Sequence, residues 1–172
     1  MNIILCGMMG AGKTTIGIKI AELTGRRWYD TDGVIVDRYG KISDIFEYYG
    51  EAHFRRLETQ IVQELCQKDN LIISTGGGLV LKSENTELLC KNGKIVFLRA
   101  SLQTLAARLK VDGTRPLLEH STEGIKERLD GLMRERAPIY ESVSNYVVDV
   151  DNKSIDDIAK EVISLIEAEE KQ

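Results

Sequence analysis

Short apolar runs alternate along the chain with longer stretches in which apolar residues recur at helical spacing. Apolar runs without polar interruptions are typical of strands buried on both faces of a sheet. Repeated alternation of strand and helix indicates a parallel sheet that is covered by helices on both sides. The pattern therefore predicts an α/β fold with five strands, at residues 2–6, 27–30, 71–75, 94–98 and 146–150.

The first half of the chain carries the clearest helix signals. We expect a helix over residues 13–24, ended by Gly25, because glycine is favoured just beyond a helix. Residues 33–68 contain no convincing strand pattern and are predicted to form consecutive helices, which break at Gly40 and Gly50. A parallel sheet does not require this second group of helices, so it forms an insert in the alternation.

Further helices are expected in the second half. One covers residues 102–110, and the last begins at Ser154, where Asp157 lies three residues on as a capping box. The run 134–140 is expected to end a helix, with Pro138 preventing its continuation.

Two segments depart from plain alternation and divide the expected single domain of residues 1–172. The helical stretch at 33–61 is predicted to be a substrate-binding insert. The polar, turn-rich stretch at 111–122 has the length and composition of an active-site lid. The remaining segments are expected to form the core: residues 1–32, 62–110 and 123–172.

Composition excludes some classes of protein. The net charge of −4 gives no reason to expect a nucleic-acid partner, and no apolar run approaches the ~20 residues that span a bilayer. The N-terminus lacks the features of a signal peptide. Cys6, Cys66 and Cys90 form no CxxC pair, so we expect three reduced, buried thiols and a cytoplasmic protein.

The strongest motif is a phosphate-binding loop at residues 7–14, GMMGAGKT, which matches G-x-x-x-x-G-K-[ST] completely. It follows a predicted strand and opens a predicted helix, as such a loop requires. Glycines let successive N–H groups converge on phosphate oxygens, and the helix start adds its positive dipole end. Lys13 is expected to bridge the β- and γ-phosphates, and the Thr14 hydroxyl is expected to ligate Mg²⁺.

A phosphate loop alone does not separate motors, GTPases, regulatory ATPases and small-molecule kinases. The chain has no N-K-x-D run for guanine recognition, and 172 residues is short for a motor. Small kinases of the nucleoside-monophosphate-kinase type are therefore the leading class.

Asp30-Thr31-Asp32 ends the second predicted strand, at the end of the sheet where the phosphate loop also lies. One carboxylate there can hold hydrated Mg²⁺ beside Thr14, and the other can accept a proton from an attacking hydroxyl. The alternative is a cluster at the start of a helix, where aspartate is common.

Two further motifs suit an anionic acceptor. Arg55 in the helical insert can grip a carboxylate with paired hydrogen bonds, although an arginine on a solvated helix face is the alternative. Three consecutive glycines at 76–78 follow the third strand and permit close approach of a ligand to bare backbone. Their alternative is a tight turn, which rarely needs three glycines.

Two more arginines lie in the second half. Arg115 in the predicted lid can close on the phosphate oxygens, stabilising the charge that spreads over them during transfer and excluding water. Arg136 can add positive charge at the cleft, although the helix dipole alone also favours cations near a helix end.

Taken in order, these motifs resemble those of the shikimate kinase family over essentially the whole chain, from Asn2 to about Ile166. The resemblance rests on the phosphate loop, Asp30-x-Asp32, Phe54-Arg55, the three glycines, Arg115-Pro116-Leu117 and Arg136-Ala137-Pro138-x-Tyr140. It implies a P-loop fold of three α/β/α layers with strand order 2-3-1-4-5. It also implies transfer of the γ-phosphate of ATP to the 3-hydroxyl of shikimate, on the route to chorismate and aromatic amino acids.

The resemblance also implies roles for single residues. Asp32 is the expected base, with Lys13 and Arg115 assisting transfer, and Glu58 is expected to orient Arg55. One Mg²⁺ is expected at Thr14 and, through water, at Asp30. The implied ATP contacts are Gly10, Ala11, Gly12, Lys13, Thr14, Thr15, Arg108 and Arg115, and the implied shikimate contacts are Asp32, Arg55, Gly77, Gly78 and Arg136.

Two alternatives remain. A related gluconate-type kinase shares the core, but Arg55 together with residues 76–78 argues against it. A catalytically silent nucleotide-binding regulator is expected to have lost Asp32, Lys13 or the lid arginine, and all three are present. The expected partners are ATP and shikimate alone, with no nucleic acid or membrane, and a monomer is expected because no heptad pattern is present.

Overall fold

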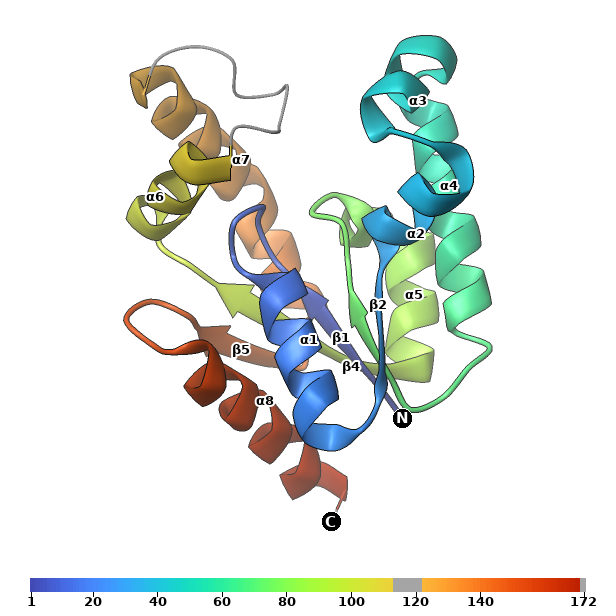
Figure 1. Ribbon diagram of the computed structural model, residues 1–172, viewed down its shortest axis with the longest axis vertical. Helices are drawn as coiled ribbons and strands as arrows, with labels where there is room; N and C mark the ends of the chain where they lie inside the picture. The colour runs from blue at the N-terminus through green and yellow to red at the C-terminus, as the bar shows by residue number, and fades with distance from the viewer. Residues whose placement is uncertain (113–121, 171–172) are drawn as a thin grey trace.

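A five-stranded parallel sheet lies at the centre of the computed structural model, which describes residues 1–112 and 122–170 (Figure 1). The order across the sheet is β2-β3-β1-β4-β5, so the strand order implied by the family resemblance is confirmed. The five predicted strands are confirmed with small shifts at their ends: β1 (Asn2–Cys6), β2 (Arg27–Asp30), β3 (Leu71–Ser74), β4 (Gly93–Arg99) and β5 (Tyr146–Asp149).

The central strand β1 pairs with β3 on one side and β4 on the other, and all five of its residues are buried. The hydrogen-bonding groups of its polar first residue, Asn2, find partners at the start of β3 and in the loop before it. The Asn2 amide donates to the carbonyl of Lys68 at 2.9 Å, and its Oδ1 accepts the N–H of Leu71 at 2.9 Å. A buried asparagine paired in this way costs little and joins the starts of two adjacent strands.

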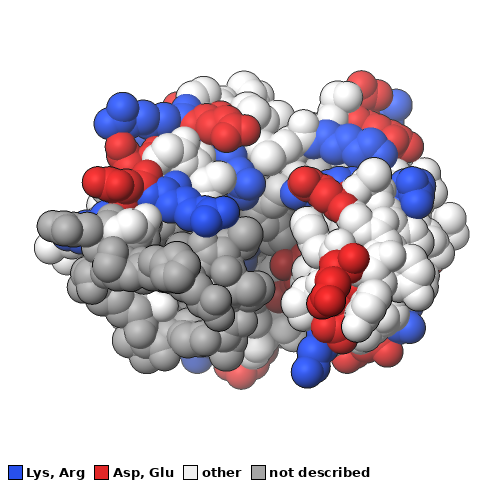
Figure 2. All heavy atoms as spheres, turned by 90° about the horizontal axis from the view of Figure 1, so that it is seen from above, with Lys and Arg blue, Asp and Glu red and all other residues white. Residues whose placement is uncertain are grey.

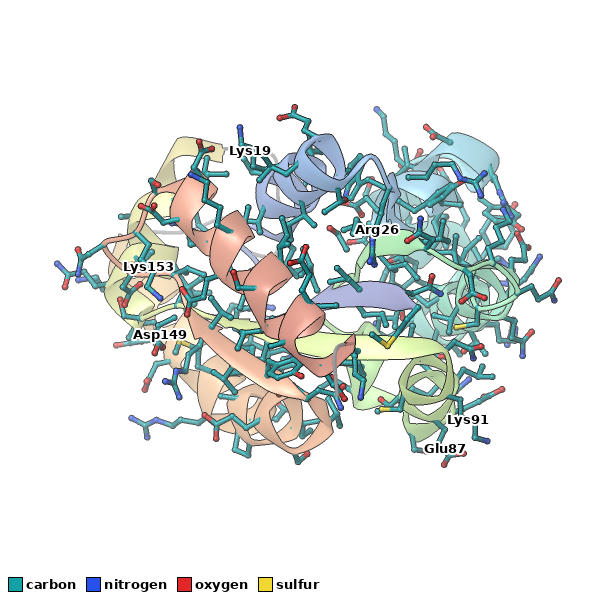
Figure 3. The ribbon with its side chains drawn as sticks, turned by 90° about the horizontal axis from the view of Figure 1, so that it is seen from below. Lys19, Arg26, Glu87, Lys91, Asp149 and Lys153 are labelled. Carbon is teal, nitrogen blue, oxygen red and sulfur yellow. The ribbon has the colours of Figure 1, made fainter. Side chains whose placement is uncertain are left out.

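Helices cover both faces of the sheet. Helices α1 (Lys13–Thr24) and α8 (Ile155–Glu170) lie on one face, whereas α5 (Ser83–Asn92) and α7 (Thr122–Val143) lie on the other (Figure 3). The capping box predicted at the start of α8 is present in part: the N–H of Asp157 donates to Ser154 Oγ at 3.1 Å, and the Asp157 carboxylate accepts the Ser154 hydroxyl at 2.7 Å. The three-layer α/β/α expectation is therefore confirmed.

The helical insert stands beside the carboxyl end of the sheet (Figure 1). It consists of α2 (Thr31–Tyr39), α3 (Ile42–Tyr49) and α4 (Glu51–Leu65). Gly40 and Gly50 separate these helices with φ angles of 91° and 79°. Residues with side chains rarely adopt such angles, and the predicted breaks are confirmed.

On the opposite side of this end, α6 (Leu102–Asp112) and the beginning of α7 flank the segment that the sequence predicts to be a lid. Helix α6 extends two residues beyond the expected 102–110. Residues 113–121 of that segment, including Arg115, lie outside the described residues.

The expectation that Pro138 ends a helix is wrong, because α7 continues through it to Val143. A proline inside a helix removes one backbone hydrogen bond and costs about 3 kcal/mol. Two residues further on, the fully buried Tyr140 is packed against Phe97 of β4, with ring centroids 5.2 Å apart. Burying a large aromatic side chain offsets that cost.

The sequence pattern does not predict α5, because the helix has few apolar residues and its buried face includes Asn85.

The expectation of three buried thiols needs correction. Of the three free thiols, Cys6 is buried and Cys66 is half-buried, whereas Cys90 is exposed. Burial raises the pKa of the Cys6 thiol to about 12, which makes it unreactive.

In the described part of the chain, every helix is too short or too polar to cross a membrane.

Candidate active site

The phosphate loop connects β1 to α1 and depends on its glycines. Gly7, Gly10 and Gly12 have φ angles of 139°, 82° and 93°, all in the region that residues with side chains avoid. A Cβ on Gly7 would also lie 2.7 Å from the carbonyl oxygen of Leu98, closer than such atoms approach. Glycine is therefore needed at these positions for the loop to adopt this backbone conformation and to pass close to β4.

Lys13 folds back over this loop. Its ammonium donates to the carbonyl oxygens of Gly7 at 2.8 Å and of Met8 at 2.9 Å. The first turn of α1 contains no acidic residue, so the helix's own side chains do not oppose an anion at the positive end of its dipole. A lysine charge and a helix start thus lie together at one loop, which suits polyphosphate.

Asp30 connects the phosphate loop to the insert. One carboxylate oxygen accepts the Thr14 hydroxyl at 2.8 Å, and the other accepts the N–H groups of Asp32 at 3.0 Å and Gly33 at 3.3 Å. Asp30 is therefore the N-cap of α2, as the alternative interpretation held, and also the partner of Thr14.

The Thr14 and Asp30 oxygens fit magnesium. Mg²⁺ usually takes few protein oxygens and keeps its waters and substrate phosphates as the other ligands. The described residues contain no group of three or more His, Cys, Asp and Glu side chains arranged for a metal. This donor set is consistent with an ion that arrives with the nucleotide.

The three glycines after β3 receive side chains from two helices of the insert. A Cβ on Gly76 would lie 2.5 Å from Asp32 Oδ1, and a Cβ on Gly78 would lie 2.6 Å from an Arg55 guanidinium nitrogen. The N–H of Gly76 donates to Thr31 Oγ1 at 2.9 Å. Gly76 and Gly78 are therefore required by the close approach of Asp32 and Arg55, which a simple tight turn does not explain.

Arg55 is held in place from both sides. It pairs with Glu58 at 2.7 Å and with Glu51 at 3.0 Å, and its guanidinium lies 5.5 Å from the centre of the Phe54 ring. Glu58 is 1% exposed, and burial raises the pKa of its carboxyl while Arg55 acts in the opposite direction. The predicted contact between Glu58 and Arg55 is present. The solvated-face interpretation describes the exposed Arg56 instead.

Arg136 reaches the same glycines from α7. One of its terminal nitrogens would lie 3.7 Å from a Cβ on Gly77. Its Nε is buried, and no described residue hydrogen-bonds to that atom. Asp32, Arg55 and Arg136 come from three helices and meet at one glycine turn beside the phosphate loop.

Seen from above (Figure 2), acidic and basic side chains lie on both sides of the hollow at this end of the molecule. On the far side of the phosphate loop, the exposed Arg108 of α6 donates to the carbonyl of Gly10 at 3.1 Å. The start of α6 is tied to the segment after β5, since Asp151 accepts the N–H of Ser101 at 3.1 Å. The structure therefore places Arg108 against the phosphate loop.

Sequence reasoning missed a hydrogen-bond chain beneath the loop. Trp28 Nε1 donates to Ser74 Oγ at 3.0 Å, and Ser74 Oγ donates to the Lys13 carbonyl at 2.9 Å. A Cβ on Gly17 would lie 2.5 Å from Trp28 Nε1, so α1 needs glycine there. The only signal in the sequence is a serine inside an apolar strand.

The sequence motif that contains Tyr140 also assigns no role to its hydroxyl. Its hydroxyl donates to the Gly77 carbonyl at 2.6 Å from a fully buried position. Burial raises the pKa of Tyr140 to about 12, although nearby Arg136 acts in the opposite direction, so the hydroxyl keeps its proton at physiological pH.

Comparisons with known proteins agree with this geometry. The family model for shikimate kinase matches residues 9–167. The shikimate kinase of Methylococcus capsulatus is 41% identical over 167 residues, 96% of this chain and 92% of that protein. The shikimate kinase of Legionella pneumophila is 40% identical over 169 residues, 98% of this chain and 95% of that protein.

Solved structures give the same result. Shikimate kinase from Acinetobacter baumannii in complex with shikimate matches with a TM-score of 0.92 at 36% identity, over 99% of this chain and 95% of that one. Shikimate kinase from Aquifex aeolicus matches with a TM-score of 0.81 at 31% identity, over 98% of both chains. With a family model and full-length relatives in agreement, the chain belongs to the shikimate kinase family.

Proposed function

We propose that this protein transfers the γ-phosphate of ATP to the 3-hydroxyl of shikimate, giving shikimate 3-phosphate and ADP in the biosynthesis of chorismate and aromatic amino acids. One observation carries the proposal. Asp32 and Arg55 both press against the glycine turn at 76–78, immediately beside a phosphate loop. A carboxylate and an arginine placed together suit an acceptor that has both a hydroxyl and a carboxylate.

On the donor side, ATP phosphates take the backbone N–H groups of the loop. Lys13 exchanges its bonds to the Gly7 and Met8 carbonyls for the β- and γ-phosphates, where it offsets developing charge. The exposed Arg108 lies where it can cover the nucleotide. The full set of proposed ATP contacts in the described chain is Gly10, Ala11, Gly12, Lys13, Thr14, Thr15 and Arg108.

One Mg²⁺ accompanies the nucleotide. Thr14 supplies a direct ligand and Asp30 holds a coordinated water, which is consistent with the 2.8 Å contact between them. The ion supplies charge neutralisation at the phosphates. The protein residues orient it, because Asp30 is itself held by two backbone N–H groups of α2.

On the acceptor side, Arg55 and Arg136 hold the shikimate carboxylate, and the backbone of Gly77 and Gly78 completes the pocket. Asp32 binds the shikimate hydroxyls and accepts the proton of the attacking one. The buried Arg136 Nε supports this assignment, because a buried charged donor atom that no described residue hydrogen-bonds is stabilised by an anionic ligand.

The remaining assignments complete the proposal. Residues 1–32, 62–110 and 123–172 form the core, 33–61 the substrate-binding insert and 111–122 the lid. Arg115 closes over the phosphates from that lid. The protein acts as a cytoplasmic monomer, with ATP and shikimate as its only partners.

The decisive experiment measures ADP production with Mg²⁺ and ATP in the presence of shikimate, gluconate, a nucleoside monophosphate or no acceptor. We expect turnover with shikimate alone, and ³¹P NMR should place the phosphate on the 3-oxygen. Turnover confined to gluconate would instead support the gluconate-type kinase. Tight ATP binding with no turnover on any acceptor would support a silent regulator.

A further inference from the structure

Tyr140 lies where three parts of the site meet. Its hydroxyl donates to the carbonyl of Gly77 at 2.6 Å and lies 3.8 Å from the sulfur of Met8 in the phosphate loop. Arg136, one helical turn earlier on α7, contacts the same glycine turn. The tyrosine ring is fixed by its buried contact with Phe97. A rigid donor therefore holds one carbonyl of the glycine turn.

That carbonyl belongs to the peptide unit between Gly77 and Gly78. A glycine–glycine peptide meets little steric resistance to rotation, because neither residue has a Cβ. In a trans peptide the C=O and N–H point in opposite directions. A hydrogen bond that fixes the Gly77 carbonyl toward Tyr140 therefore also aims the Gly78 N–H away from Tyr140.

The Gly78 end of this peptide faces the acceptor side. A Cβ on Gly78 would lie 2.6 Å and 2.9 Å from the two terminal nitrogens of Arg55, so the Arg55 guanidinium packs directly on it. If the peptide rotated, the carbonyl would replace an N–H donor near a site built for an anion. The orientation of one peptide thus affects acceptor binding more than nucleotide binding.

We propose that Tyr140 is a positioning residue that sets the affinity for the acceptor by fixing the peptide between Gly77 and Gly78. It does not touch the reacting atoms, and it acts through the glycine backbone and the neighbouring Arg136. The inference rests on the proposed function, because it identifies the acceptor pocket with residues 76–78.

Replacing Tyr140 with phenylalanine removes the hydroxyl and keeps the ring that packs on Phe97. We expect Y140F to raise the KM for shikimate about tenfold, the size of effect seen when a buried acceptor loses its donor. The kcat and the KM for ATP should stay within about twofold. Tyr146→Phe is the matched control, because the Tyr146 hydroxyl also makes a 2.6 Å hydrogen bond, to Glu169, far from the glycine turn.

A second measurement does not depend on activity. In protein labelled with ¹⁵N-glycine, Y140F should shift the Gly78 amide resonance and speed its hydrogen exchange, and Y146F should change neither. An unchanged Gly78 amide, or equal rises in both KM values, would overturn the inference. If the wild-type protein did not use shikimate, the proposed function would fail, while the glycine spectra would still test the role of Tyr140.

Discussion

At the scale of single residues, Asp30 and Asp32 have different environments although only Thr31 separates them. Both oxygens of Asp30 are occupied, one by Thr14 and one by the first N–H groups of α2. Asp32 instead faces Gly76 at the entrance of the glycine turn. A carboxylate already committed to a cap and a threonine is a poor proton acceptor, so the geometry favours Asp32 as the base.

Asp32→Asn should therefore abolish most turnover and leave nucleotide binding intact. Asparagine keeps the shape of the side chain but cannot accept the proton, and loss of a general base typically costs 10²–10⁴-fold. We expect kcat to fall by at least about 100-fold, while the Kd for Mg·ATP, measured by calorimetry, changes less than about threefold.

Asp37→Asn provides the control, because Asp37 is an exposed aspartate on the same helix. Its kcat should match that of the wild type. Near-normal turnover in the Asp32 variant would remove Asp32 from its role as base.

At the scale of elements, the position of α1 depends on a close fit against β2 and β3. Gly17 lets Trp28 and Ser74 approach the helix, and Ser74 then hydrogen-bonds to the Lys13 carbonyl at the start of α1. The phosphate loop is thus held from below by a contact between helix and sheet. Helix propensity alone argues against a glycine in the middle of α1, so packing decides this residue.

This contact predicts opposite results for two Gly→Ala substitutions in helices. Alanine at position 17 would bring a Cβ within 2.5 Å of Trp28 Nε1, whereas alanine at position 131 of α7 would have nothing within 4 Å. We expect Gly17→Ala to lower the free energy of unfolding by about 1–3 kcal/mol through overpacking. Gly131→Ala should raise it by up to about 1 kcal/mol through helix propensity.

Urea unfolding of both variants beside the wild type checks the pair. Equal effects of the two substitutions would mean that the contact between Gly17 and Trp28 relaxes without cost. Gly17→Ala should also weaken Mg·ATP binding, because a shift of α1 would move Lys13, the first residue of that helix. Gly131→Ala should leave Mg·ATP binding unchanged.

At the scale of the whole molecule, the strand order brings the site together. The phosphate loop follows β1, the two aspartates lie at the end of β2 and just beyond it, the glycine turn follows β3, and Arg108 lies on the helix after β4. Because all five strands are parallel, these segments emerge together at the carboxyl end of the sheet. At the opposite end of the sheet lies a recess of about 440 Å³. Arg26 is one of the residues that line it, and this arginine donates to the Met1 carbonyl at 3.0 Å.

A ligand that binds only the folded site should stabilise the whole protein. At a concentration of 100 times its Kd, Mg·ATP is expected to add about 2.7 kcal/mol to the free energy of unfolding. For a chain of this size that corresponds to a rise in Tm of roughly 5–10 °C. Thermal unfolding with and without nucleotide measures it, and EDTA should remove part of the shift.

Lys13→Met is the control, compared with its own unliganded form, because Lys13 also bonds to the loop carbonyls. We expect most of the nucleotide-dependent shift to disappear in this variant. A shift as large as in the wild type would show that the nucleotide binds elsewhere.

The sequence by itself determined the five strands, the helical insert and the phosphate loop. Each of these depends on local periodicity or on residues a few positions apart, which the order of amino acids states directly. The family resemblance added the strand order and the residues of the acceptor pocket. The sequence did not predict α5, which has few apolar positions, or the path of α7 through Pro138.

Only the tertiary structure decided which buried hydroxyls hold the site. Trp28 and Ser74 are 46 residues apart, and Gly77 and Tyr140 are 63 apart. Contacts at such separations form because the packing of helices on the sheet brings the residues together. No local pattern encodes them, so Ser74 and Tyr140 gain their roles from the fold.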